Sequence, residues 1–67
     1  MAVARVTKIT ASSSESLSAA VAEGIKRASK TVRGITGFHV IEQKGKVVKG
    51  KITEFRVTLE VTFILED

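Results

Sequence analysis

The sequence contains no cysteine, so this chain cannot form the disulfides that stabilise many small domains. Its single histidine, His39, has no cysteine to share a metal with, so a structural zinc site is not expected. A chain of 67 residues buries only about 60% of the surface that it exposes when unfolded, which leaves its own stability marginal. Oligomerisation is the remaining route to stability, so we predict a homo-oligomer.

The sequence also lacks the long apolar segments that membranes require. No stretch approaches about 18 consecutive apolar residues, and the N-terminal segment, with Arg5 and Lys8, lacks the apolar core of a signal peptide. The absence of cysteine fits a reducing cytoplasm, where we expect this chain. The net charge is +4, but no run of basic residues exceeds two, so no nucleic-acid arm is evident. We expect a single domain over residues 1–67, with no membrane or nucleic-acid partner.

The first half of the chain predicts a strand followed by a helix. Residues 2–10 are rich in β-forming side chains. Ser12 as N-cap would place Glu15 at the third helical position, which is the capping-box pattern. Gly34 suits the position just after a helix. We therefore predict a helix from about residue 13 to about residue 33.

The predicted helix has one apolar stripe, because its apolar residues recur at steps of three and four. These residues are Leu17, Val21, Ile25, Ala28 and Val32. Three small residues, Ala20, Gly24 and Ala28, lie four apart beside the stripe. Small side chains there would let another backbone approach the helix closely.

The second half predicts a hairpin of two long strands. Residues 35–48 form the first strand, in which Gly45 suggests a bulge, and Lys49 and Gly50 form the turn. In the second strand, residues 52–65, apolar side chains occupy every odd position from 55 onward, and polar ones alternate with them. This alternation indicates a strand with one buried face.

The last strand is long for so small a chain. Fourteen residues from Ile52 to Leu65 extend roughly 46 Å at ~3.3 Å per residue. A compact domain of this size is only about 28 Å across. The strand must therefore curl around the helix or project beyond its own subunit, and its uncovered apolar surface needs another copy.

Nothing in the sequence points to an enzyme. His39 has no evident Ser, Cys or Asp partner, so it is a poor catalytic candidate. The serines at 12–14 could hold an anion at the helix N-terminus, although capping alone also explains them.

In their order and spacing these segments resemble the dodecin family over nearly the whole chain. The segments that carry the resemblance are residues 12–16, 25–28, 31–33, 38–40 and 57–66. The resemblance implies an α+β fold of βαββ order, with a three-stranded antiparallel sheet curled around one helix. It further implies that the subunits form a hollow homododecamer, which sequesters flavins and catalyses no reaction.

The resemblance also implies a flavin site at subunit interfaces, with FMN or riboflavin as the ligand. Flavin-binding members stack the flavin ring on a Trp just before the residue that matches Phe38. They also bind the ring edge with a Gln of the last strand. This chain has Gly37 and Arg56 at those two positions, and it contains no Trp or Tyr. Glu42 and Gln43 match positions that contact the ligand, so the implied site comprises Gly37, Phe38, Glu42, Gln43 and Arg56.

Two alternatives remain open at this stage. These residues are similar to those of Trp-less dodecins, some of which are called calcium dodecins. The shell could therefore bind Ca²⁺ or a small anion instead of flavin, or be purely structural. Calcium takes about six to eight oxygen ligands, so a site here would be shared between subunits. A nucleic-acid-binding module is less supported, because the predicted sheet presents Thr, Glu and Arg where RNA-reading sheets expose aromatic rings.

Two of the implied site residues also have simpler explanations. Arg56 fits either a bidentate phosphate clamp or an ion pair between strands or subunits. Gly37 fits either a space for a ligand or a bulge or close backbone approach.

Overall fold

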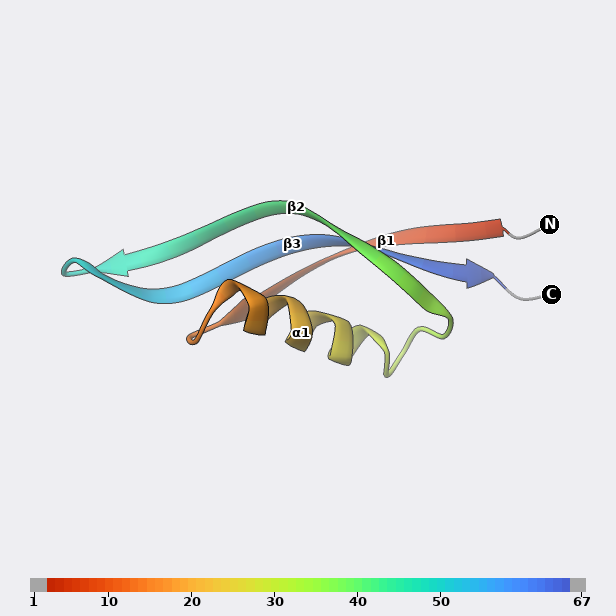
Figure 1. Cartoon of the computed structure of the whole chain (residues 1–67), viewed down its shortest axis with the longest axis horizontal. Helices are drawn as coiled ribbons and strands as arrows, with labels where there is room; N and C mark the ends of the chain where they lie inside the picture. The colour runs from red at the N-terminus through yellow and green to blue at the C-terminus, as the bar shows by residue number, and fades with distance from the viewer. Residues whose placement is uncertain (1–2, 66–67) are drawn as a thin grey trace.

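The computed structural model describes residues 3–65, which form one helix and three strands in βαββ order. The elements are β1 (Val3–Ser13), α1 (Leu17–Ala28), β2 (Ile35–Val48) and β3 (Lys51–Leu65). β3 lies in the centre of an antiparallel sheet of order β1-β3-β2, and α1 packs on one face of the sheet (Figure 1). The predicted α+β class and strand arrangement are confirmed. Ala2, which the sequence placed in the first strand, lies outside the described residues.

The core of the domain is the alternating face of β3. Val57, Leu59 and Val61 are buried there together with Ala20 of α1. The predicted alternation is thus confirmed in the middle of the strand. Burial decreases toward the two ends, where Ile52 and Leu65 are 58% and 46% exposed.

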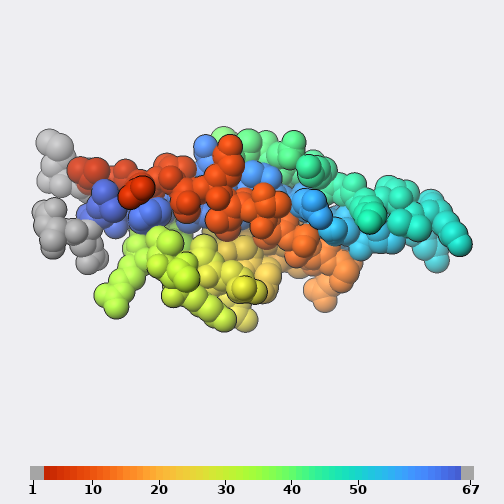
Figure 2. Space-filling view, turned by 180° about the vertical axis from the view of Figure 1, so that it is seen from behind, coloured from red at the N-terminus to blue at the C-terminus, as the bar shows by residue number. Residues whose placement is uncertain are grey.

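The hairpin of β2 and β3 projects beyond the helix (Figures 1 and 2). The molecule measures 52 × 19 × 13 Å, far longer than a compact domain of about 28 Å would be. Of the two outcomes expected for so long a strand, projection is the one found. One helix of 12 residues covers only the middle of the sheet, so apolar side chains near the hairpin turn stay exposed.

The turn of this hairpin lies where the sequence predicts it. Lys49 and Gly50 both have positive φ angles, 52° and 78°. This is the pattern of a two-residue type I′ turn, whose twist matches that of the two strands. The predicted bulge at Gly45 is wrong, because Gly45 pairs in register with Phe55. A Cβ at this glycine would lie only 3.1 Å from the Glu54 carbonyl oxygen, so close backbone approach explains it.

The helix is shorter than predicted and begins four residues later than the capping-box pattern indicates. Its N-cap is Ser16, whose Oγ accepts a hydrogen bond from the Ala19 N–H at 2.9 Å. The sequence prediction of Ser12 as N-cap is wrong because β1 continues through Ser13. Ser12 pairs with Arg56 of β3 instead. Ser13 accepts a hydrogen bond from the Glu15 N–H, which turns the chain between strand and helix.

The helix also ends earlier, at Ala28, with Ser29 as its C-cap. The Ser29 hydroxyl donates to the Ile25 carbonyl at 2.8 Å and satisfies one carbonyl of the last turn. Gly34 has the predicted positive φ of 76°, but it lies in the connection to β2 rather than just after the helix. Its carbonyl accepts a hydrogen bond from the Ile64 N–H, so it ties this connection to β3.

The small residues of α1 allow the helix to approach the sheet closely, as predicted. Ala20 and Gly24 are its two buried residues. A Cβ at Gly24 would lie 3.1 Å from the Ala11 Cβ and 3.4 Å from the Leu59 Cδ1. The apolar stripe beside them is only half-buried, so the helix contacts the sheet along its small residues. Within residues 3–65, no helix is long and apolar enough to cross a membrane.

The observed N-cap gives a direct test of the helix boundary. Ser16→Ala removes the hydroxyl that caps the Ala19 N–H, and we expect it to lower the free energy of unfolding by ~1 kcal/mol. Ser12→Ala serves as the control, because Ser12 is exposed on β1 and should change stability by no more than ~0.5 kcal/mol. Urea denaturation at one fixed protein concentration measures both. A larger loss for Ser12→Ala would contradict this boundary.

Candidate ligand-binding face

The face of the sheet opposite α1 carries most of the polar side chains of the strands. Residues directly opposite each other in an antiparallel pair point to the same face, so the register defines this surface. We call it the polar face. It comprises Val6, Lys8, Thr10 and Ser12 of β1, Glu54, Arg56, Thr58, Glu60 and Thr62 of β3, and Gly37, His39, Glu42, Lys44 and Lys46 of β2.

Two ion pairs and one contact between a histidine and a carboxylate lie on the polar face. The Arg56 Nη2 donates to both carboxylate oxygens of Glu54, at 2.9 and 3.1 Å. The Lys44 Nζ lies 3.6 Å from the Glu42 Oε1. The His39 Nδ1 lies 3.6 Å from the Glu60 Oε1. All six side chains are partly or largely exposed, so these pairs organise the surface more than they stabilise the fold.

Gly37 leaves open space on this face. A Cβ built at Gly37 would meet no atom within 4 Å, and the backbone there lies outside the left-handed region. A register shift between Ile35 and Gly37 places a bulge just before it. Its surroundings therefore leave room for a larger side chain or for a ligand.

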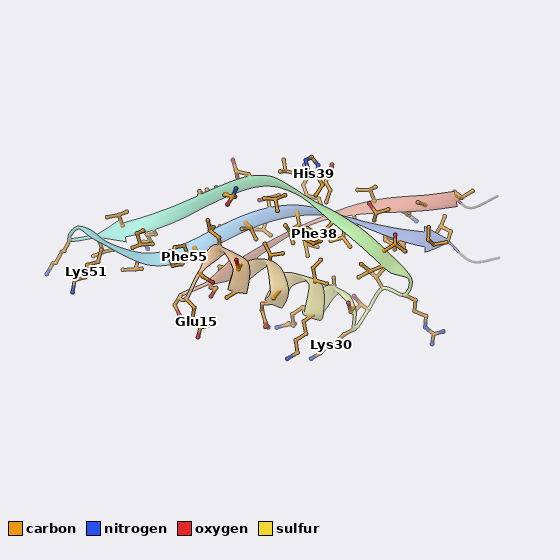
Figure 3. The ribbon with its side chains drawn as sticks, viewed as in Figure 1. Glu15, Lys30, Phe38, His39, Lys51 and Phe55 are labelled. Carbon is orange, nitrogen blue, oxygen red and sulfur yellow. The ribbon has the colours of Figure 1, made fainter. Side chains whose placement is uncertain are left out.

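The structure divides the five implied site residues between the two faces of the sheet. Gly37, Glu42 and Arg56 belong to the polar face. Phe38 points to the helix side, where it lines a hollow of about 620 Å³ with Val21 and Ile25 (Figure 3).

Gln43 also belongs to the helix side, with Leu17 and Phe55 around a second hollow of about 350 Å³. One ligand molecule cannot contact both faces of a single subunit. The five residues can therefore contact one ligand only if different subunits supply them.

Gly37 and Arg56 are also far apart along the polar face. Gly37 pairs with Thr62, six residues from Arg56 on β3. At ~3.3 Å per residue this separation is roughly 20 Å. A flavin ring that contacts both positions must therefore take Gly37 from one subunit and Arg56 from another.

A basic hollow of about 250 Å³ lies next to Arg56. Lys44 and Lys46 of β2 line it together with Arg56 and Glu54. The lysines outweigh the single carboxylate, so the hollow suits an anionic group. These lysines were not predicted as site residues from the sequence, although their spacing of two in a predicted strand places them on one face. Among residues 3–65, no three His, Asp or Glu side chains gather closely enough to hold a metal ion.

The fold thus defines the class of protein: a small α+β domain with a projecting hairpin, a partly covered core and a polar sheet face opposite the helix. A model of the dodecin family matches residues 3–66 of the chain. The dodecin of Thermus thermophilus is 37% identical over 60 residues, which cover 90% of this chain and 87% of that protein. The chain therefore belongs to the dodecin family, as the sequence resemblance predicts.

Solved structures agree with this assignment. An arginine-to-alanine variant of the T. thermophilus dodecin has a TM-score of 0.94 and 34% identity, with both chains covered completely. The dodecin from Streptomyces davaonensis has a TM-score of 0.93 and 36% identity, with 98% and 97% coverage of this chain and that one. A calcium dodecin from Mycobacterium tuberculosis, described as calcium-chelating with a novel calcium-binding site, has a TM-score of 0.81 and 38% identity. The match covers 96% of this chain and 91% of that one.

Proposed function

We propose that this protein is a non-catalytic homo-oligomer, a hollow dodecamer, that sequesters a flavin or flavin nucleotide between its subunits. The observation that carries the proposal is the division of the implied site: the open position at Gly37 and the cation at Arg56 lie roughly 20 Å apart on one subunit. A site of this kind is completed only by assembly. The exposed apolar side chains of the projecting hairpin supply surface for that assembly.

A phosphorylated flavin fits the polar face better than a free one. Gly37 offers no aromatic surface for the ring, so stacking there contributes nothing. Lys44, Lys46 and Arg56, by contrast, present cationic donors around one hollow. Phosphate accepts charge-assisted hydrogen bonds from such groups. We therefore expect FMN to bind more tightly than riboflavin.

This preference is measured by titrating both flavins against the assembled protein and following flavin fluorescence. FMN should bind roughly tenfold more tightly at low salt, because one additional charge-assisted contact is worth ~1.5 kcal/mol. Added salt should weaken FMN binding and leave riboflavin binding nearly unchanged. Light scattering on the same sample should give a mass near that of twelve chains.

Each part of the proposal can fail separately. Equal affinities that do not respond to salt would remove the phosphate-binding role of the basic hollow. Absence of binding by either flavin would reject flavin sequestration, and a stable monomer would reject assembly.

Calcium binding is the second candidate function, and the similarity to a calcium dodecin favours it. Glu42 supplies a carboxylate that is 57% exposed on the polar face. Since about six to eight oxygens are needed, copies of Glu42 from several subunits would have to share one ion. Calorimetric titration with Ca²⁺ of the parent and of Glu42→Gln distinguishes the two functions, because only calcium binding at Glu42 is lost in the variant.

A further inference from the structure

His39 lies next to the open position at Gly37. The two residues are two apart on β2 and share the polar face, so their side-chain positions are roughly 7 Å apart. The His39 side chain is 76% exposed and points away from α1 (Figure 3). A planar ligand placed over Gly37 would therefore reach the imidazole of His39.

The imidazole is the one aromatic ring on the described part of the polar face. The three phenylalanines belong to the other face of the sheet: Phe38 pairs with Val61, Phe55 with Gly45, and Phe63 with Ile35. His39 therefore offers an aromatic ring on the polar face, two residues from Gly37, which has no side chain.

Glu60 lies beside this ring. It is the cross-strand partner of His39, and its Oε1 lies 3.6 Å from the His39 Nδ1. A negative charge near Nδ1 favours a proton on that nitrogen, which leaves Nε2 as the nitrogen available to a ligand. In the neutral ring Nε2 accepts a hydrogen bond, and in the protonated ring it donates one. Arg56, by contrast, can only donate hydrogen bonds.

His39 has one cationic side chain and two carboxylates around it on the polar face. Lys8 lies in the same row across β3, Glu60 faces the ring directly, and Glu42 follows on β2 beyond a register shift. Over the whole polar face, leaving His39 aside, the cationic side chains outnumber the carboxylates by one. A charged imidazole doubles this excess and strengthens the attraction for an anion.

We infer that His39 is a ligand-contacting residue of the site proposed above, and that it makes the affinity for a phosphorylated flavin rise as the pH falls from 8 to 5.5. The inference rests on the proposed function, since it concerns the same site. Histidine is suited to this because its charge ordinarily changes between about pH 5 and 8. The site would then bind its anionic ligand most tightly in an acidified medium and release it as the pH recovers.

The test compares the full-length parent with His39→Gln, which keeps a hydrogen-bonding group but does not titrate. FMN affinity is measured by fluorescence at pH 8 and at pH 5.5 in both proteins. The second ionisation of the phosphate, near pH 6, affects both proteins equally and cancels in the comparison. The parent should gain severalfold more affinity on acidification than the variant, because only the parent acquires a further positive charge on the polar face.

His39→Phe separates the ring from its charge. This variant keeps an aromatic ring but cannot be protonated, so it should lose the additional gain in FMN affinity at pH 5.5. Identical pH dependence in the parent, His39→Gln and His39→Phe overturns the role of His39 while leaving flavin sequestration intact. Failure of the parent to bind FMN at either pH overturns the proposed function itself, and this inference with it. Light scattering confirms that each variant remains assembled.

Discussion

Leu59→Asp is expected to abolish both the fold and the assembly. Leu59 is fully buried at the centre of β3, between Val57 and Val61. Removing such a leucine side chain alone costs ~2–5 kcal/mol, and an unpaired carboxylate at the same place costs more. A core of this size supplies only ~3–5 kcal/mol, so the variant should be unfolded at micromolar concentration. Circular dichroism and light scattering measure the loss of strand signal and of mass.

Thr53→Asp is the matched control for this substitution. It adds the same charge to the same strand, but at an exposed position near the hairpin turn, where the Thr53 hydroxyl makes only a 3.4 Å contact with the Lys46 carbonyl. We expect it to remain folded. An intact assembly of Leu59→Asp would mean that this face of β3 is not the core.

Gly37→Trp is expected to raise flavin affinity by at least about tenfold. The indole would stack on the flavin ring, which is worth ~1 kcal/mol beyond the apolar area that it buries. The substitution should not strain the fold, because a Cβ at Gly37 meets no atom within 4 Å and the backbone is not left-handed. Titration of riboflavin against parent and variant, followed by fluorescence quenching, gives the two affinities.

Gly37→Leu is the control for this gain, because it adds apolar volume without an aromatic face. It should quench riboflavin no more than the parent does. If Leu matched Trp, or if the parent already bound riboflavin as tightly as the Trp variant, stacking at position 37 would not be what limits the affinity.

The hairpin and the core strand could be predicted from the sequence because their signals are local. The strict alternation in β3 and the Lys49-Gly50 turn each reflect the geometry of a few neighbouring residues. The start of the helix could not be predicted in the same way. Several serines of this segment could serve as the N-cap. Ser12 is excluded because it pairs with Arg56, a residue distant in the sequence.

The division of the implied site residues between the two faces of the sheet could not be predicted from the sequence either. With simple alternation, Gly37 and Gln43 would share one face of β2. The register shift between Val40 and Glu42 leaves Ile41 without a partner and reverses the alternation beyond it. Glu42, rather than Gln43, therefore joins Gly37 and His39. A bulge of this kind follows from the fit of β2 to the twisted central strand, which the residues of β2 alone do not reveal.

The central place of β3 also determines when the subunit can fold. β1 and β2 do not pair with each other, and both form their ladders only with β3, which is synthesised after them. While the ribosome synthesises β1, α1 and β2, no strand of the sheet has its partner. Val3 pairs with Leu65, so the start of β1 is paired only after the end of β3 has been synthesised. Such distant pairing slows folding. The sheet therefore forms only after β3 has been synthesised, and the apolar side chains of β1 and α1 stay without their partners on β3 until then.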